Sequence, residues 1–70
     1  MFKVQVINHK ERSISTNSTT FDSFEDADKK ALECAKLHLA IYKHKQIGAR
    51  LTKMDAGYKV RHFEIRITKI

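Results

Sequence analysis

The sequence has no proline and no tryptophan, and its 70 residues include one cysteine and two glycines. A single cysteine cannot form an internal disulfide, which fits a reducing compartment, so we expect a cytoplasmic protein. The two glycines stand at expected turns and leave no glycine-rich loop of the kind that holds phosphate. No apolar run approaches the ~20 residues of a membrane span, and the N-terminus enters a strand pattern at once. We therefore expect neither a membrane segment nor a signal peptide.

Candidate catalytic and metal-binding groups are also scarce. Cys34 and His38 stand four residues apart and could join another histidine in a zinc site, but structural zinc sites usually contain paired cysteines. Cys34 falls in the middle of the expected helix, away from the helix start or cleft that activates a nucleophilic thiol. The carboxylates between residues 22 and 28 match no Ca²⁺ loop and are explained by helix capping. We expect no enzyme activity, no cofactor, no metal and no small-molecule substrate.

The longest periodic segment runs from Ser23 to Gln46 and predicts one amphipathic helix. Ser23 or the residue before it can cap the first turn, and lysines near the end complement the helix dipole. Gly48 is placed to end the helix in a left-handed conformation. Asp28 falls inside the apolar sector of this helix and Leu37 falls outside it. At ~1.5 Å per residue the helix is long for so small a domain, so we expect its last turn to extend beyond the body.

Four other segments predict β-strands. Phe2–Asn8 alternates, with its odd-numbered positions on one face and its even-numbered positions on the other. Ser13–Phe21 is rich in threonine and predicts either a short edge strand followed by a loop or a mobile loop. Ala49–Asp55 predicts a strand that leads through a hairpin turn at Asp55–Gly57, with glycine supplying a positive φ. Tyr58–Lys69 predicts the longest strand.

The apolar positions of this last strand change parity. Tyr58 and Val60 occupy even positions, whereas three later apolar residues occupy odd positions. A strand cannot change faces without an irregularity, so the pattern predicts a β-bulge or bend near Arg61–His62. The polar residues that follow, among them Glu64 and Arg66, are expected to face solvent.

Together these segments predict a single α+β domain over residues 1–70. The expected order is β-β-α-β-β, a small, mainly antiparallel sheet of about four strands with one long helix on one face. A chain of this length has no second helix to cover the other face. That face is therefore expected to meet water or a partner.

The charge of the chain is positive and uneven. The formal net charge is +6; residues 1–35 contain five basic and six acidic residues, whereas residues 36–70 contain nine basic and two acidic ones. A basic C-terminal half favours an acidic partner such as nucleic acid or a nucleoprotein. Exposed aromatic residues are scarce, which favours contact with the phosphate backbone over reading of bases. The candidate binding residues are Lys43, Lys45, Arg50, Lys59, Arg61, Arg66 and Lys69.

In length and in strand–helix–strand order the chain resembles the small single-domain inhibitors encoded by phages and mobile elements, anti-CRISPR proteins among them. The resemblance implies a non-enzymatic protein whose basic surface occupies a place meant for nucleic acid, or touches nucleic acid beside a protein epitope. We therefore expect a protein that binds nucleic acid or a nucleoprotein complex. The alternative is a protein–protein interaction module or homodimer that uses the uncovered sheet face, with the positive charge incidental.

Overall fold

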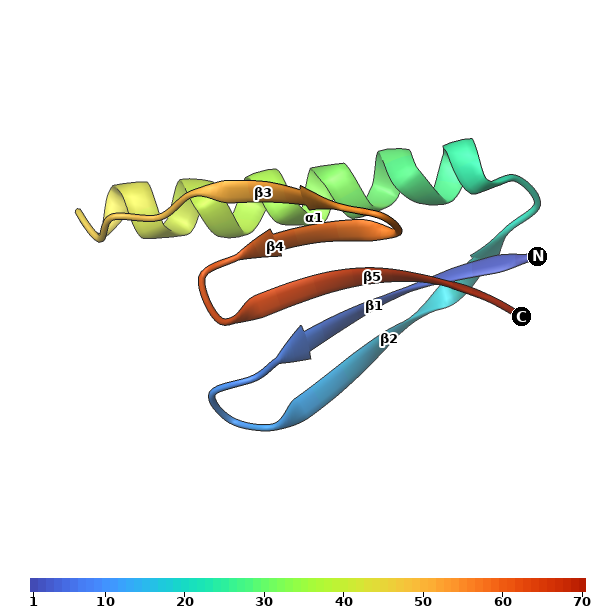
Figure 1. Ribbon diagram of the computed structural model, residues 1–70, viewed down its shortest axis with the longest axis horizontal. Helices are drawn as coiled ribbons and strands as arrows, with labels where there is room; N and C mark the ends of the chain where they lie inside the picture. Colours follow the sequence, from blue (N-terminus) through green and yellow to red (C-terminus); the bar gives the residue numbers. More distant parts are fainter.

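The computed structural model contains one helix on one five-stranded sheet (Figure 1). Its elements are β1 (Phe2–Asn8), β2 (Ser13–Phe21), α1 (Phe24–His44), β3 (Leu51–Met54), β4 (Gly57–Val60) and β5 (Phe63–Lys69). The structure describes the backbone of residues 1–70 and the side chains of residues 1–16 and 19–70. The strands are all antiparallel, in the order β2-β1-β5-β4-β3. The predicted α+β class is confirmed, with five strands in place of about four.

The additional strand arises because the segment predicted as one long strand is a hairpin. Val60 pairs with Phe63, so Arg61 and His62 form a two-residue turn, and the prediction of a bulged single strand is wrong. Arg61 has a φ of 52°, the positive value that tight hairpin turns require at their first central residue. A chain that reverses after two residues brings even positions of β4 opposite odd positions of β5. The parity change therefore marked a chain reversal.

The core lies between α1 and the face of the sheet that we call the inner face. Ala27, Ala31 and Ala35 are fully buried and form a stripe at four-residue spacing along the helix. These small side chains let the helix approach the sheet closely, where Val60 and Ile65 are also fully buried. The C-terminal turns of α1 extend past the β4–β5 turn, as predicted (Figure 1).

Asp28, the one carboxylate in the apolar sector of the helix, has a specific partner in the core. The buried Tyr58 hydroxyl donates a hydrogen bond to Asp28 Oδ1 at 2.9 Å. Burial raises the pKa of Tyr58, and the hydrogen bond and negative charge of Asp28 raise it further. Tyr58 is therefore a neutral donor at physiological pH and fixes α1 to β4.

The helix ends at residues different from those expected. Ser23 caps the first turn as predicted, because its hydroxyl accepts from Asp26 N at 3.2 Å. The left-handed residue after the last turn is Gln46, with a φ of 59°, and the prediction of Gly48 for this role is wrong. Ile47 N donates to Tyr42 O at 2.9 Å and Gln46 N to Lys43 O at 3.0 Å, the two bonds of a Schellman motif. The left-handed residue of this motif therefore stands two residues before the glycine.

Replacing Gln46 with glycine should therefore stabilise the protein. A non-glycine residue in the left-handed region costs about 1 kcal/mol, and Gln46→Gly removes that cost while it keeps the backbone bonds. We expect the free energy of unfolding to rise by about 0.5–1 kcal/mol in urea denaturation. Gly48→Ala is the control, because its added Cβ would have no neighbour within 4 Å. A lower denaturation midpoint for Gln46→Gly would contradict this account of the helix end.

The sheet face turned away from α1, which we call the outer face, is not covered by any element that the structure describes (Figure 1). The segment predicted as either strand or loop is a strand over its whole length, Ser13–Phe21, and it forms one edge of the sheet. The expected strand over Ala49–Asp55 is shorter, Leu51–Met54, and forms the other edge. The outer face thus spans five strands.

Candidate nucleic-acid interface

The register of the strands places basic residues on a diagonal of the outer face. Lys3 on β1 is opposite Thr68, two positions from Arg66 on β5. Lys59 on β4 is opposite Glu64, which is two positions from Arg66 in the other direction. Each step along Lys3, Arg66 and Lys59 moves one strand across and two residues along, and such diagonal neighbours lie ~7–8 Å apart. The three cations therefore form one line on the outer face.

Arg50 extends this line. Lys59 is opposite Thr52 on β3, and Arg50 stands two residues before Thr52, directly before the strand begins. Arg50, Lys59 and Arg66 are exposed, and Lys3 is half-buried. We call the four residues Lys3, Arg66, Lys59 and Arg50 the basic stripe.

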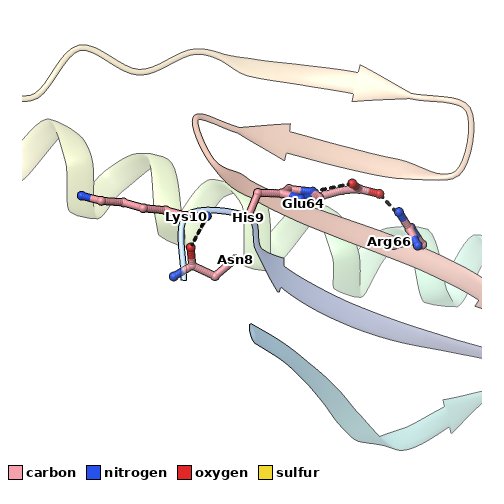
Figure 2. A network of polar contacts seen from close by, with 5 residues as sticks. All are labelled: Asn8, His9, Lys10, Glu64 and Arg66. Carbon is pink, nitrogen blue, oxygen red and sulfur yellow. Dashed lines mark hydrogen bonds and ion pairs between the residues drawn. The ribbon is translucent and has the colours of Figure 1, made fainter. Parts of the chain in front are cut away.

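Glu64 is the only acidic residue at the outer-facing strand positions that the structure describes, and it is engaged on both sides (Figure 2). Its Oε2 accepts from Arg66 Nε at 2.7 Å, and its Oε1 lies 2.9 Å from His9 Nε2. Its side chain is 10% exposed, so the prediction of a solvent-facing residue is wrong. The hydrogen bonds from Arg66 and then His9 lower the pKa of Glu64, against the opposing effect of burial. An ionised carboxylate only accepts, so His9 Nε2 is the donor.

The outer-facing positions beside the stripe include uncharged polar side chains together with the apolar Ile7, Ile14 and Met54. Thr68 donates to Gln5 Oε1 at 3.2 Å, and Gln5 Nε2 donates to Thr16 at 3.3 Å. These amide and hydroxyl groups are of the kind that contact phosphate and sugar oxygens in nucleic-acid complexes. Among the described side chains, the strand aromatics Phe2, Phe21, Tyr58 and Phe63 all take inner-facing register positions. The outer face therefore has charge and hydrogen-bonding groups without a platform for base stacking.

Three of the predicted binding residues gather at the C-terminal end of α1, in what we call the helix-end cluster: Lys43, Lys45 and Arg61. Arg61 is fixed there, because it donates to Gly48 O at 2.7 Å and its guanidinium lies 5.4 Å from the centre of the Tyr42 ring. Leu51 pairs with Val60, so Arg50 and Arg61 lie at the same end of the β3–β4 hairpin. The basic stripe thus ends beside the helix-end cluster.

Of the seven predicted binding residues, six lie along the stripe or in the helix-end cluster, and Lys69 does not. Lys69 pairs with Phe2 at the opposite end of the sheet, and its register position faces the inner side. Lys69 therefore cannot form one patch with Arg50 and Arg66 on the outer face, because residues three apart on a strand point to opposite faces.

The groups considered for zinc or nucleophilic chemistry have structural contacts. His38 Nδ1 lies 2.8 Å from Cys34 O, and since a carbonyl only accepts, Nδ1 is the protonated nitrogen. The His38 ring lies 4.4 Å from the Phe63 ring, and His62 lies on Phe63 at 4.7 Å between ring centres. Among the described residues, no three histidine, cysteine or acidic side chains are grouped as metal ligands.

Sequence reasoning did not identify the contact between Glu64 and His9, which are 55 residues apart in the chain. It placed Lys3 on the outer face with Arg50 and Arg66, by the alternation of Phe2–Asn8, but did not include Lys3 among the seven candidate binding residues. The signal for Lys3 was therefore present in the sequence. Nothing in the sequence signalled the Glu64 network, because it depends on the register between β1 and β5.

Comparison of the chain with protein-family models, with curated proteins and with solved structures finds no match. Within the residues that the structure describes, no helix combines the length and the apolar character needed to cross a membrane.

Proposed function

We propose that this protein binds nucleic acid through the phosphate backbone, with the basic stripe as the contact surface. The observation that supports this function best is the diagonal of four cations on an uncovered sheet face. The one carboxylate among the described strand positions of that face is already paired with Arg66 and His9. A line of cations with hydroxyl and amide groups beside it suits a chain of phosphates better than it suits an apolar partner.

The helix-end cluster lengthens this surface. The helix-end cluster adjoins Arg50, so a nucleic acid that follows the stripe would contact Arg61, Lys43 and Lys45 next. The expected role as an inhibitor of a nucleoprotein machine is compatible with such a surface and stays a prediction. The alternative homodimer through the outer face also stays a prediction, and the exposed outer-facing Ile14 and Met54 are the apolar contacts that it would use.

The proposed function predicts salt-dependent binding that is independent of sequence. Four phosphate contacts give a slope of about −3 to −4 for log affinity against log salt concentration. Fluorescence anisotropy with labelled duplex DNA, single-stranded DNA and RNA, from ~50 to ~300 mM salt, measures this slope. Two unrelated sequences of equal length should bind alike, because the outer face has no described aromatic or base-reading site. Absence of binding to all three probes at ~50 mM salt would reject the proposal.

A further inference from the structure

The guanidinium of Arg66 is held in place before any ligand binds. Its Nε–H is used by Glu64 Oε2 at 2.7 Å, and among the described residues no other contact of this side chain is found. An arginine has five N–H donors in a fixed planar fork, so the donors of its two terminal nitrogens stay available. The side chain of Arg66 is 50% exposed, which leaves this end accessible to solvent.

Glu64, which holds Arg66, is itself fixed by its surroundings. Each carboxylate oxygen has one partner, Arg66 on Oε2 and His9 on Oε1. His9 is fixed in turn, because its backbone N donates to His62 O at 2.9 Å across the end of the sheet. Figure 2 shows His9, Glu64 and Arg66 in a row on the side of the sheet away from α1. The orientation of Arg66 is therefore set by a chain of contacts that begins at the β1–β2 turn.

The strand position opposite Arg66 on β4 has no side chain, for a structural reason. Arg66 is opposite Gly57 on β4, and a Cβ at Gly57 would lie 1.9 Å from Ile65 O. No side chain can therefore stand at this position without a shift of the backbone. On the other side Arg66 is opposite Gln5, whose amide is occupied by two threonines. Because the side chain of Arg66 is half exposed and Gly57 contributes no side chain beside it, the guanidinium is accessible to a ligand.

We propose that Arg66 is the phosphate anchor of the basic stripe: the terminal nitrogens of its guanidinium bind one phosphodiester group in a two-pronged contact, and Glu64 is the positioning residue. This inference rests on the proposed function and adds to it a division of roles. The other stripe residues, Lys3, Lys59 and Arg50, contribute positive charge that any cation would contribute. Arg66 also contributes two guanidinium nitrogens in a fixed orientation. Paired N–H···O contacts to phosphate are the interaction in which arginine and lysine differ most.

The test uses two variants for which positioning and simple charge predict different results. Arg66→Lys keeps the charge and loses the fork, and we expect the affinity for labelled duplex DNA at ~100 mM salt to fall about fivefold. Glu64→Thr removes a negative charge from the stripe, so charge alone predicts tighter binding. If Glu64 positions Arg66, affinity should instead fall about threefold, because the guanidinium loses its fixed orientation.

Glu11→Gln is the matched control, since Glu11 is an exposed carboxylate in the β1–β2 turn and its replacement raises the net charge by the same single unit. It should bind as the parent protein does or slightly more tightly. Wild-type affinity in Arg66→Lys, or a gain in Glu64→Thr equal to that of Glu11→Gln, would overturn the inference. If Glu64→Thr does not fold by circular dichroism, Arg66→Lys decides alone. Failure of the parent protein to bind any probe rejects the proposed function. If the parent protein binds but either overturning result is found, only the role of Arg66 as anchor is rejected.

Discussion

Replacing Arg50 and Lys59 together with glutamate should lower the affinity for nucleic acid by at least ~10-fold at ~50 mM salt. Both residues are exposed, and neither has a side-chain contact among the described residues, so the fold should not depend on them. The change removes two of the four stripe cations and puts two carboxylates in their places. The salt slope should become shallower by about 2, because two fewer counterions are released. Fluorescence anisotropy against salt concentration measures both quantities.

The matched control for this variant is Lys29→Glu with Lys36→Glu on the exposed side of α1. Both double variants lower the net charge from +6 to +2, so they share any effect of total charge. Lys29 and Lys36 lie on the helix, across the molecule from the outer face. The helix variant should keep most of the affinity and the parent salt slope. Equal losses in the two variants would mean that net charge, and not the stripe, governs binding.

The substitution Gly57→Ala should destabilise the protein strongly. Gly57 has a φ of 131°, and an added Cβ would lie 1.9 Å from Ile65 O and 3.1 Å from Arg66 Cα. These neighbours are backbone atoms of β5, which cannot move away without breaking the pairing of the sheet. We expect a loss of about 2–4 kcal/mol in the free energy of unfolding and a melting midpoint lower by roughly 10–20 °C. Calorimetry or circular dichroism during heating measures this shift.

A loss of this size is a large part of the stability of a domain of 70 residues, because small domains bury a limited share of their surface. Gly48→Ala makes the same chemical change where no atom lies within 4 Å of the new Cβ, and it should melt close to the parent protein. Similar melting of the two variants would show that the close approach of β4 to β5 at Gly57 is wrong.

The sequence alone predicted the elements whose signals are local. Ser23 caps the helix because its hydroxyl reaches a backbone N–H three residues away, and the alternation of Phe2–Asn8 assigns each residue to a face without knowledge of its neighbours. The basic C-terminal half, the antiparallel class and the uncovered sheet face follow from the same kind of reasoning. The hairpin turn was predicted at Asp55–Gly57 with glycine supplying the positive φ, and the structure places it at Asp55–Ala56 with Gly57 as the first residue of β4.

The sequence did not distinguish a bulged strand from a hairpin at Arg61–His62. Both interpretations explain a change of parity, and the usual signal for a two-residue turn, glycine or asparagine, is absent. Arg61 adopts the positive φ there while its side chain is held by Gly48 O and the Tyr42 ring, contacts that exist only after the helix has packed. Gln46 takes the left-handed position at the helix end for a different, local reason, because the backbone bonds from Gln46 and Ile47 to Lys43 and Tyr42 close the helix before Gly48.

The composition of the chain determined that the protein is basic, and the alternation of its strands determined which faces many of its cations occupy. Only the tertiary structure decided that Lys3, Arg66 and Lys59 form a diagonal, that Lys69 faces the other way, and that Glu64 is buried between Arg66 and His9. These facts depend on the register between strands that are distant in the chain. Register is set by many weak side-chain contacts across the whole sheet, and no short stretch of sequence contains that information.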